Sequence, residues 1–151
     1  MRAEKITRER PVYPPERKHH LATYINVGGC KAWTLWDSGS TTTGITPAFA
    51  HMADLTVFPL SNPHTLQLGT VGSQSTVNFG TKSRVVAPGI DKSIYLDIAN
   101  FNHYDMIIGT PFMQDNKVWL DFESNRIIMN GVATPATPVE EKDIDEHIRH
   151  H

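Results

Sequence analysis

Hydrophobic and polar residues alternate along several short segments of the chain, with the two-residue period that is typical of β-strands. The first such segment is 21–27, and a Gly28-Gly29 dipeptide separates it from an apolar run over 32–36. Glycine adopts positive φ without steric cost, so this dipeptide favours a tight turn. We therefore predict a β-hairpin whose second strand ends immediately before Asp37.

A second hairpin is predicted over 65–79, where two alternating segments flank a tip rich in glycine and serine. The tip contains Gly69, Thr70, Val71, Gly72 and Ser73. Small residues between two strands favour a hairpin with a mobile end. The pattern alone is equally consistent with a hairpin that closes over a ligand and with an ordinary surface hairpin.

The remaining elements are two short helices and several strands. A threonine followed by a proline marks the start of each helix, because the threonine suits the cap and the fixed φ of proline suits the first helical position. In the first helix, Phe49, Met52 and Ala53 share one face, which predicts that they face the core. We expect helices over 48–55 and 110–115, and strands over 93–99, 104–108, 118–122 and 126–129. The predicted fold class is mainly all-β, with one or two short helices.

Length and composition indicate one folded domain between two tails. The chain has 151 residues, of which 39% are hydrophobic and 20% are charged, and this suits a single domain with a modest core. Residues 1–19 are rich in proline, lysine and arginine, which predicts a flexible linker. We assign the folded domain to 20–132 and a flexible charged tail to 133–151.

Charge and cysteine content exclude several classes of partner and site. The formal net charge is -2 and no basic stretch is interleaved with aromatic residues, so nucleic acid is not an expected partner. Cys30 is the only cysteine, and the sequence has no signal peptide or membrane span, which favours an intracellular, cytoplasmic protein without a membrane partner. Histidines at 19–20 and 147–151 lack the ligand spacing of a metal site, so we expect neither a metal ion nor another cofactor.

Candidate chemistry lies where the first hairpin ends. The stretch consists of Asp37, Ser38, Gly39, Ser40 and Thr41. A strand end is a rigid place to hold a carboxylate, but aspartate, serine and glycine are also the commonest turn residues, so the stretch by itself indicates an ordinary turn. A second apolar run, far downstream, ends in Ile107, Ile108 and Gly109. The combination of the two motifs carries more weight than either one.

Taken together, these motifs resemble the retropepsin family of aspartic proteases. The resemblance covers residues 21–132 and is closest to the protease segments of Gypsy-type LTR retrotransposon polyproteins, particularly fungal ones, in which runs similar to Ile-Ile-Gly-Thr-Pro-Phe-Met recur. It implies a closed barrel or sandwich in which Asp37 is catalytic and the hairpin at 65–79 is a flap over bound peptide. By the same resemblance, Ser38 braces the catalytic loop, Gly39 lets the substrate lie close, and the Ile-Ile-Gly element packs beneath the loop.

The resemblance also implies how the protein would act. Pepsin-like chains carry the Asp-Thr/Ser-Gly motif twice and this chain carries it once, so the implied enzyme is a homodimer with one Asp37 from each chain. The implied activity is that of an aspartic endopeptidase that cleaves polypeptide, including its own polyprotein. Ser40 and Thr41 complete the support of the loop, although viral members often have an aspartate near Thr41 and usually an arginine at the position of Thr110. The alternative is a catalytically silent or domesticated module of the same fold, which binds a peptide or protein partner.

Overall fold

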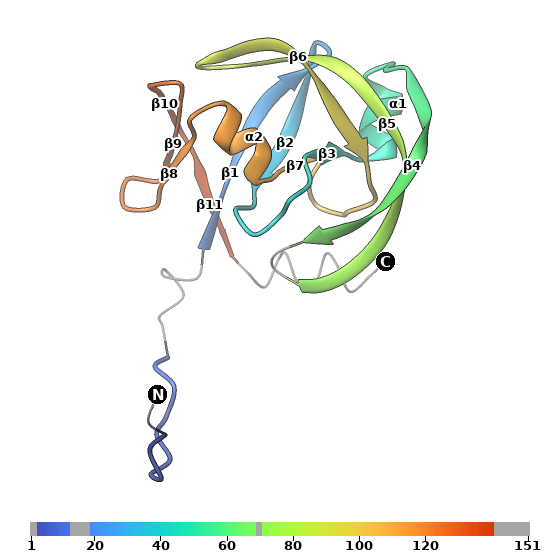
Figure 1. The fold of residues 1–151 in the computed structure, drawn as a ribbon. Coiled ribbons are helices and arrows are strands. Elements are labelled where there is room, and N and C mark those ends of the chain that lie inside the picture. The colour runs from blue at the N-terminus through green and yellow to red at the C-terminus, as the bar shows by residue number, and fades with distance from the viewer. Residues whose placement is uncertain (1–2, 13–18, 69–70, 141–151) are drawn as a thin grey trace.

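The chain forms a mainly β structure with two short helices (Figure 1). The computed structural model describes residues 3–12, 19–68 and 71–140, and for 66–68 and 71–75 it describes the backbone alone. In chain order the elements are β1 (His19–Val27), β2 (Cys30–Trp36), β3 (Gly44–Ile45), α1 (Pro47–Met52), β4 (Val57–Leu68), β5 (Val71–Ala87), β6 (Ile90–Ile98), β7 (Met106–Ile108), α2 (Thr110–Asp115), β8 (Trp119–Asp121), β9 (Arg126–Met129), β10 (Val132–Pro135) and β11 (Thr137–Glu140). The predicted fold class is confirmed.

The larger sheet closes on itself. Its eight strands follow the order β11-β1-β2-β7-β3-β6-β5-β4, and an additional pairing joins β1 to β5. In that pairing Asn26 lies opposite Val86 and Val27 lies opposite Val85. The result is a barrel in which most strand edges are paired around the core. The strands β8, β9 and β10 form a separate three-stranded sheet at one side of the barrel (Figure 1).

β7 is the buried centre of the larger sheet. It runs parallel to β2, with Trp36 opposite Ile108, and antiparallel to β3. All three of its residues are buried, which explains why its sequence is continuously apolar instead of alternating. The parallel pairing places the ends of β2 and β7 side by side, so Asp37 and Gly109 follow adjacent strand ends.

Two apolar clusters form the core, and β7 contributes to both. Ile108 belongs to the larger cluster, with Trp36 and Phe112, whereas Ile107 belongs to the smaller one, because successive residues of a strand point to opposite faces. The buried indole N–H of Trp36 donates a hydrogen bond to Thr23 Oγ1 (2.9 Å). This bond satisfies the one polar atom that the large side chain brings into the core.

The local predictions for the first hairpin and helix hold in most respects. Gly28-Gly29 adopts φ angles of 60° and 89°, as the tight turn requires. α1 follows Thr46, whose hydroxyl accepts the N–H of Phe49 (3.1 Å). Met52 is 62% exposed, however, so the prediction that it faces the core is wrong. Phe49 is buried as predicted, together with Ala50, and Ala53, the residue after the helix, packs half-buried against the core.

The C-terminal segment corrects the predicted domain limits. The residues assigned to a charged tail from 133 onward include most of β10 and all of β11, and β11 pairs antiparallel with β1, from His19 opposite Glu140 to Ala22 opposite Thr137. Prolines interrupt the alternation there, but an edge strand tolerates them because it needs bonds on one side only. Regular structure therefore extends to Glu140, and 141–151 lie outside the described residues.

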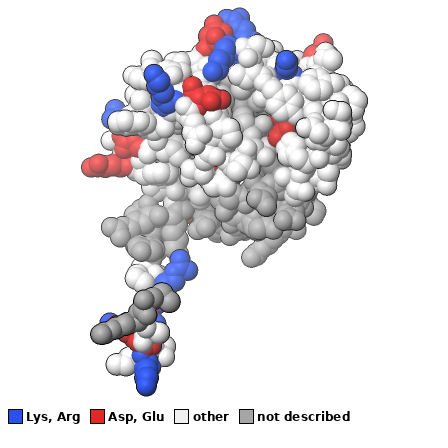
Figure 2. All heavy atoms as spheres, viewed as in Figure 1, with Lys and Arg blue, Asp and Glu red and all other residues white. Residues whose placement is uncertain are grey.

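Two surface properties bear on possible partners. On the face shown in Figure 2, basic and acidic side chains of the barrel are interspersed, so no patch of a single sign dominates that face. Among the residues that the structure describes, no helix is long and apolar enough to cross a membrane. In the same residues, no group of three or more His, Cys, Asp or Glu side chains is placed to hold a metal ion.

Candidate active site

Asp37 is the first residue after β2, and its backbone continues the pairing of β2 with β7. Its N–H donates to the carbonyl of Ile108 (2.9 Å), and only 2% of the residue is exposed. β2 has neighbours on both edges, β1 and β7, so the carboxylate extends from a backbone that is fixed from both sides. The residue predicted to be catalytic is thus a buried acid at the end of a central strand.

The loop after Asp37 is a tight turn that the carboxylate itself helps to hold. Asp37 Oδ1 accepts the N–H of Gly39 (3.0 Å), and the Asp37 carbonyl accepts the N–H of Ser40 (3.1 Å). This is how aspartate side chains commonly stabilise turns. Ser38 and Gly39 are exposed at the tip, whereas Ser40 is fully buried. The turn therefore presents a small, open tip next to a buried acid.

Gly109 lies directly against this loop. Its φ of -103° is open to any residue, but a Cβ at this position would lie 2.6 Å from the carbonyl oxygens of both Ser40 and Thr42 and 3.0 Å from the nitrogen of Thr42. All three are backbone atoms, so no side-chain rotation could relieve the clash. The Ile-Ile-Gly element therefore needs glycine for space and not for its conformational freedom.

Hydrogen bonds from threonine and serine brace the loop. Thr110 donates to the Ser40 carbonyl from its N–H (2.9 Å) and from its hydroxyl (3.3 Å). The N–H of Gly109 donates to Thr43 Oγ1 (3.0 Å), and Ser40 Oγ donates to the Thr42 carbonyl (3.1 Å). The bonds from Thr110 span 70 residues of sequence and the bond from Gly109 spans 66. Thr110, which makes two of these bonds, stands at the position where viral members of the family that the sequence resembles usually carry arginine.

A cavity of about 380 Å³ lies beside the loop. Its lining comes from the loop, β4, β6 and α2, and consists of Thr41, Thr43, His64, Lys92, Ile94, Tyr95, Asp97, Pro111, Phe112, Asp115 and Asn116. Thr41, which was expected to support the loop, is exposed and lines this cavity. Thr43 was not singled out from the sequence, although it braces Gly109; its only signal was the run of hydroxyl residues after Asp37.

Asp97 is a second buried acid among the described residues, and it lies in the wall of this cavity. It is 5% exposed; its Oδ1 accepts the Tyr95 hydroxyl (2.7 Å), and its Oδ2 lies 3.3 Å from His64 Nε2. Burial, and after it the hydrogen bond to Asp97, raise the pKa of Tyr95 well above its usual value, so the hydroxyl remains a donor. Sequence reasoning missed Asp97 because an aspartate in an alternating strand is expected on the solvent side.

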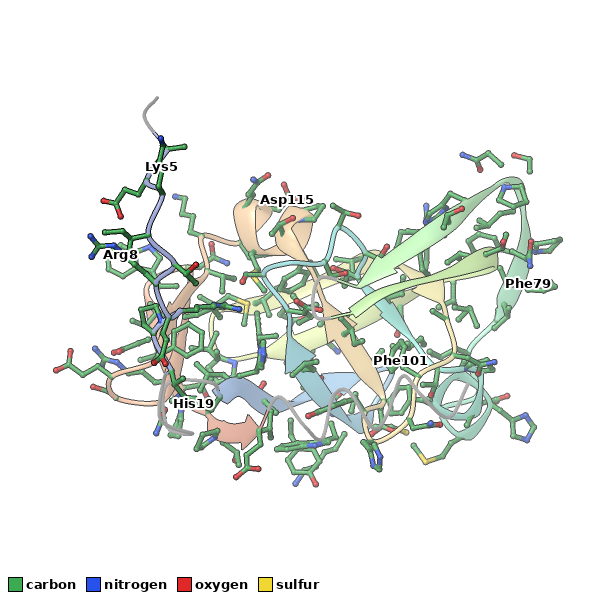
Figure 3. All side chains as sticks on the ribbon, turned by 90° about the horizontal axis from the view of Figure 1, so that it is seen from below. Lys5, Arg8, His19, Phe79, Phe101 and Asp115 are labelled. Carbon is green, nitrogen blue, oxygen red and sulfur yellow. The ribbon has the colours of Figure 1, made fainter. Side chains whose placement is uncertain are left out.

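The predicted flap corresponds to the hairpin of β4 and β5. Thr65 of β4 pairs with Thr76 of β5, and the ends that lead to the tip lie beside the loop after β2 in both views (Figures 1 and 3). In Figure 3, Phe79 of β5 and His19 at the start of β1 lie at opposite ends of the molecule. Of the predicted tip residues, Gly69 and Thr70 lie outside the described residues, while Val71, Gly72 and Ser73 begin β5.

Comparisons with known proteins give a consistent picture. A family model described as retroviral aspartyl protease matches residues 17–134. Among solved structures, the retroviral protease-like domain of Ddi1 from Leishmania major has a TM-score of 0.59 at 14% identity, over 79% of this chain and 94% of that chain. The EIAV protease in complex with the inhibitor HBY-793 has a TM-score of 0.49 at 20% identity, over 62% of this chain and 85% of that chain. No curated protein matches the chain.

These comparisons bear on fold and family. At 14% identity, the likeness to the Ddi1 domain is one of fold, and it confirms the retropepsin-like architecture that the sequence motifs implied. The family model spans most of the chain and includes both the loop that begins at Asp37 and the strand end at Gly109. The chain therefore belongs to the retroviral aspartyl protease family.

Proposed function

We propose that this protein is an aspartic endopeptidase whose site is completed by a second copy of the chain. The observation that carries the proposal is Asp37, a buried carboxylate at the end of a central strand with an open Ser38-Gly39 tip beside it. Two such loops that meet about a two-fold axis would bring both Asp37 side chains together. Two neighbouring carboxylates share one proton, because like charges at close range cannot both ionise.

The shared proton supports hydrolysis of a peptide bond. The ionised Asp37 would take a proton from a water molecule that attacks the peptide carbonyl, and the protonated partner would donate its proton towards the substrate. Gly39 leaves room for the peptide backbone near the acids, and Ser38 can bond across the two loops. Peptide would lie extended between the loop and the β4–β5 hairpin, pairing its backbone with these elements as an added strand.

A second chain is needed because the other buried and half-buried acids of the described residues, Asp97, Asp105 and Asp121, are held by partners within the fold; Asp121 binds Arg126. Asp97 is held by Tyr95 and His64, and Asp105 accepts the backbone N–H of Trp33 through Oδ2 (2.8 Å). Both carboxylates thus serve contacts within the fold. The Asp-Ser-Gly motif also occurs once in the sequence. A single chain therefore supplies one half of the proposed acid pair.

The substrate class follows from the resemblance to retroelement proteases. We propose that the enzyme acts on polypeptide in general and on the polyprotein of a Gypsy-type LTR retrotransposon in particular. Activity at mildly acidic to neutral pH fits an acid pair that must hold one proton.

One observation favours a second candidate, a peptide-binding module without activity. β11 pairs with β1 of the same chain, from His19 to Ala22, and so occupies the edge that terminal strands of a partner would otherwise use. A chain whose terminal strands are satisfied internally can remain monomeric. In that state, one Asp37 faces no second acid, and the hairpin could still hold an extended peptide without cutting it.

Two measurements separate the candidates. Sedimentation velocity over a concentration series reports whether the full chain dimerises, and a peptide library reports cleavage at the concentrations where the dimer forms. Asp37→Asn should lower turnover by roughly 10²–10⁴-fold, the range for loss of a catalytic acid or base, while Asp54→Asn, at an exposed position, serves as the matched control. Turnover that survives in purified Asp37→Asn would contradict the proposal. A chain that stays monomeric and inactive supports the binding module.

A further inference from the structure

An irregular segment divides β4 into a base, residues 57–59, and an outer arm, residues 64–68. Pro59 pairs with Phe79, and the next pair is His64 with Val77, so residues 60–63 stand opposite the single residue Asn78. A bulge of this size interrupts the backbone ladder and bends the strand. The position of the outer arm therefore depends on contacts made where regular pairing resumes, which is at His64.

Support from β6 ends at nearly the same level. The last pair of β5 with β6 is Phe79 with Ile98, so beyond it the hairpin leaves the barrel sheet. On the β5 side, Val77 is buried in the smaller apolar cluster together with Ile107, which anchors that arm. On the β4 side, Leu60 packs against the same cluster, and the side chain of His64 reaches across to Asp97 of β6 (Nε2 to Oδ2, 3.3 Å). The β4 side is thus held by an apolar contact at Leu60 and by a polar one at His64.

Asp97 is a well-fixed partner for His64. Its N–H donates to the Thr43 carbonyl (3.1 Å), and its Oδ1 accepts the Tyr95 hydroxyl (2.7 Å). The Tyr95 ring can lie across β5 because position 80 is glycine: a Cβ there would lie 2.6 Å from the Tyr95 hydroxyl oxygen. Thr43 also accepts the N–H of Gly109 through Oγ1. The acceptor of His64 is therefore tied directly to the loop that carries the candidate acid.

We infer that His64 is a positioning residue that holds the outer arm of the β4–β5 hairpin against Asp97. The imidazole can donate a hydrogen bond to the carboxylate, and a bond to an ionised acceptor is stronger than one between neutral groups. The inference rests on the proposed function, since the arm so held would be the flap of the peptidase.

The charged groups around His64 leave Asp97 as its main partner. β6 contributes Asp97, Tyr95 and Lys92 to the shared cavity, and α2 contributes Asp115. Lys92 and Asp115 are exposed, so solvent screens their influence. The buried Asp97 is therefore the charge that His64 meets most directly. On β5, the residue beside Asp97 is Gly80, which adds no charge.

Hydrogen exchange tests the contact without any need for activity. The full chain with Asp37→Asn, which prevents self-cleavage, is measured at pH 5.5, and protection factors of the amides at 60–65 are compared with those of β2. We expect His64→Gln to lower the protection of 60–65 roughly threefold, the scale of a partly exposed ion pair. His64→Lys, which places a positive charge beside Asp97, should keep the protection of the parent chain. His51→Gln, at an exposed histidine of α1, is the matched control.

Peptide cleavage by the full chain, without the Asp37 substitution, then tests the role of the arm. His64→Ala should raise KM roughly threefold at pH 5.5 and leave kcat within about twofold, because the arm contributes to binding and not to proton transfer. Equal protection of 60–65 in His64→Ala, His64→Gln and the control would overturn the inference. If the parent chain cleaves nothing, the peptidase proposal and the flap role fail together, while the exchange result still decides the His64–Asp97 contact.

Discussion

The clearest test of the site geometry is Gly109→Ala, which adds one methyl group against the back of the loop that carries Asp37. The new Cβ would lie 2.6 Å from two carbonyl oxygens, those of Ser40 and Thr42, and 3.0 Å from a backbone nitrogen. Contacts of this length lie far inside the 3.5–4.0 Å optimum for non-bonded atoms. The loop or β7 must therefore move, since neither carbonyl can rotate away independently.

The size of the effect follows from what such a movement breaks. Overpacking of a close-packed site costs about 1–3 kcal/mol, and a shift of the loop also weakens the two bonds from Thr110 to the Ser40 carbonyl, at about 0.5–1.5 kcal/mol for a typical hydrogen bond. We expect a loss of about 2–4 kcal/mol in the free energy of unfolding. Displacement of Asp37 should additionally reduce any cleavage activity beyond what the loss of stability explains.

Urea denaturation of the wild type and of Gly109→Ala, followed by far-UV circular dichroism, measures this loss directly. Gly131→Ala is the matched control, because its φ is +82° and nothing lies within 4 Å of a Cβ there. Gly131→Ala should lower the free energy of unfolding by about 1 kcal/mol, because alanine is strained at positive φ and meets no steric clash there. If Gly109→Ala proved no more costly than the control, the space argument for the Ile-Ile-Gly element would be refuted.

Three further predictions concern other parts of the fold. Trp36→Phe removes the indole donor to Thr23 from the core and should lower the free energy of unfolding by about 1–3 kcal/mol in urea titrations. Thr46→Ala removes the cap of α1 and should cost about 1 kcal/mol, measured in the same way. The hydrogen bond from Arg126 lowers the pKa of Asp121, so its stabilisation is present at neutral pH and is lost as pH falls below the usual aspartate pKa of about 3.9. A difference in Tm between wild type and Asp121→Asn that does not shrink as pH falls from 7 through this range would contradict this assignment.

Much of the local structure was determined by the sequence itself. The Gly28-Gly29 turn, the start of α1 after Thr46, and the two strands that lead to Asp37 depend on neighbouring residues: on glycine at positive φ, on a hydroxyl that caps a helix, and on the alternation of apolar positions. The motifs around Asp37 and Gly109 also carried the family resemblance, since they are short and contiguous.

The tertiary structure determined which of these segments become neighbours. The parallel pairing of β2 with β7 brings Thr110 to the Ser40 carbonyl across 70 residues, and no local pattern states that the two strands are neighbours. β11 forms because it finds the free edge of β1, although its own sequence is polar and interrupted by proline. Asp97 is buried because Tyr95 and His64 satisfy its carboxylate. The two-residue period of a strand predicts which side chains share a face. The burial of a charged side chain, in contrast, depends on partners that only the assembled fold supplies.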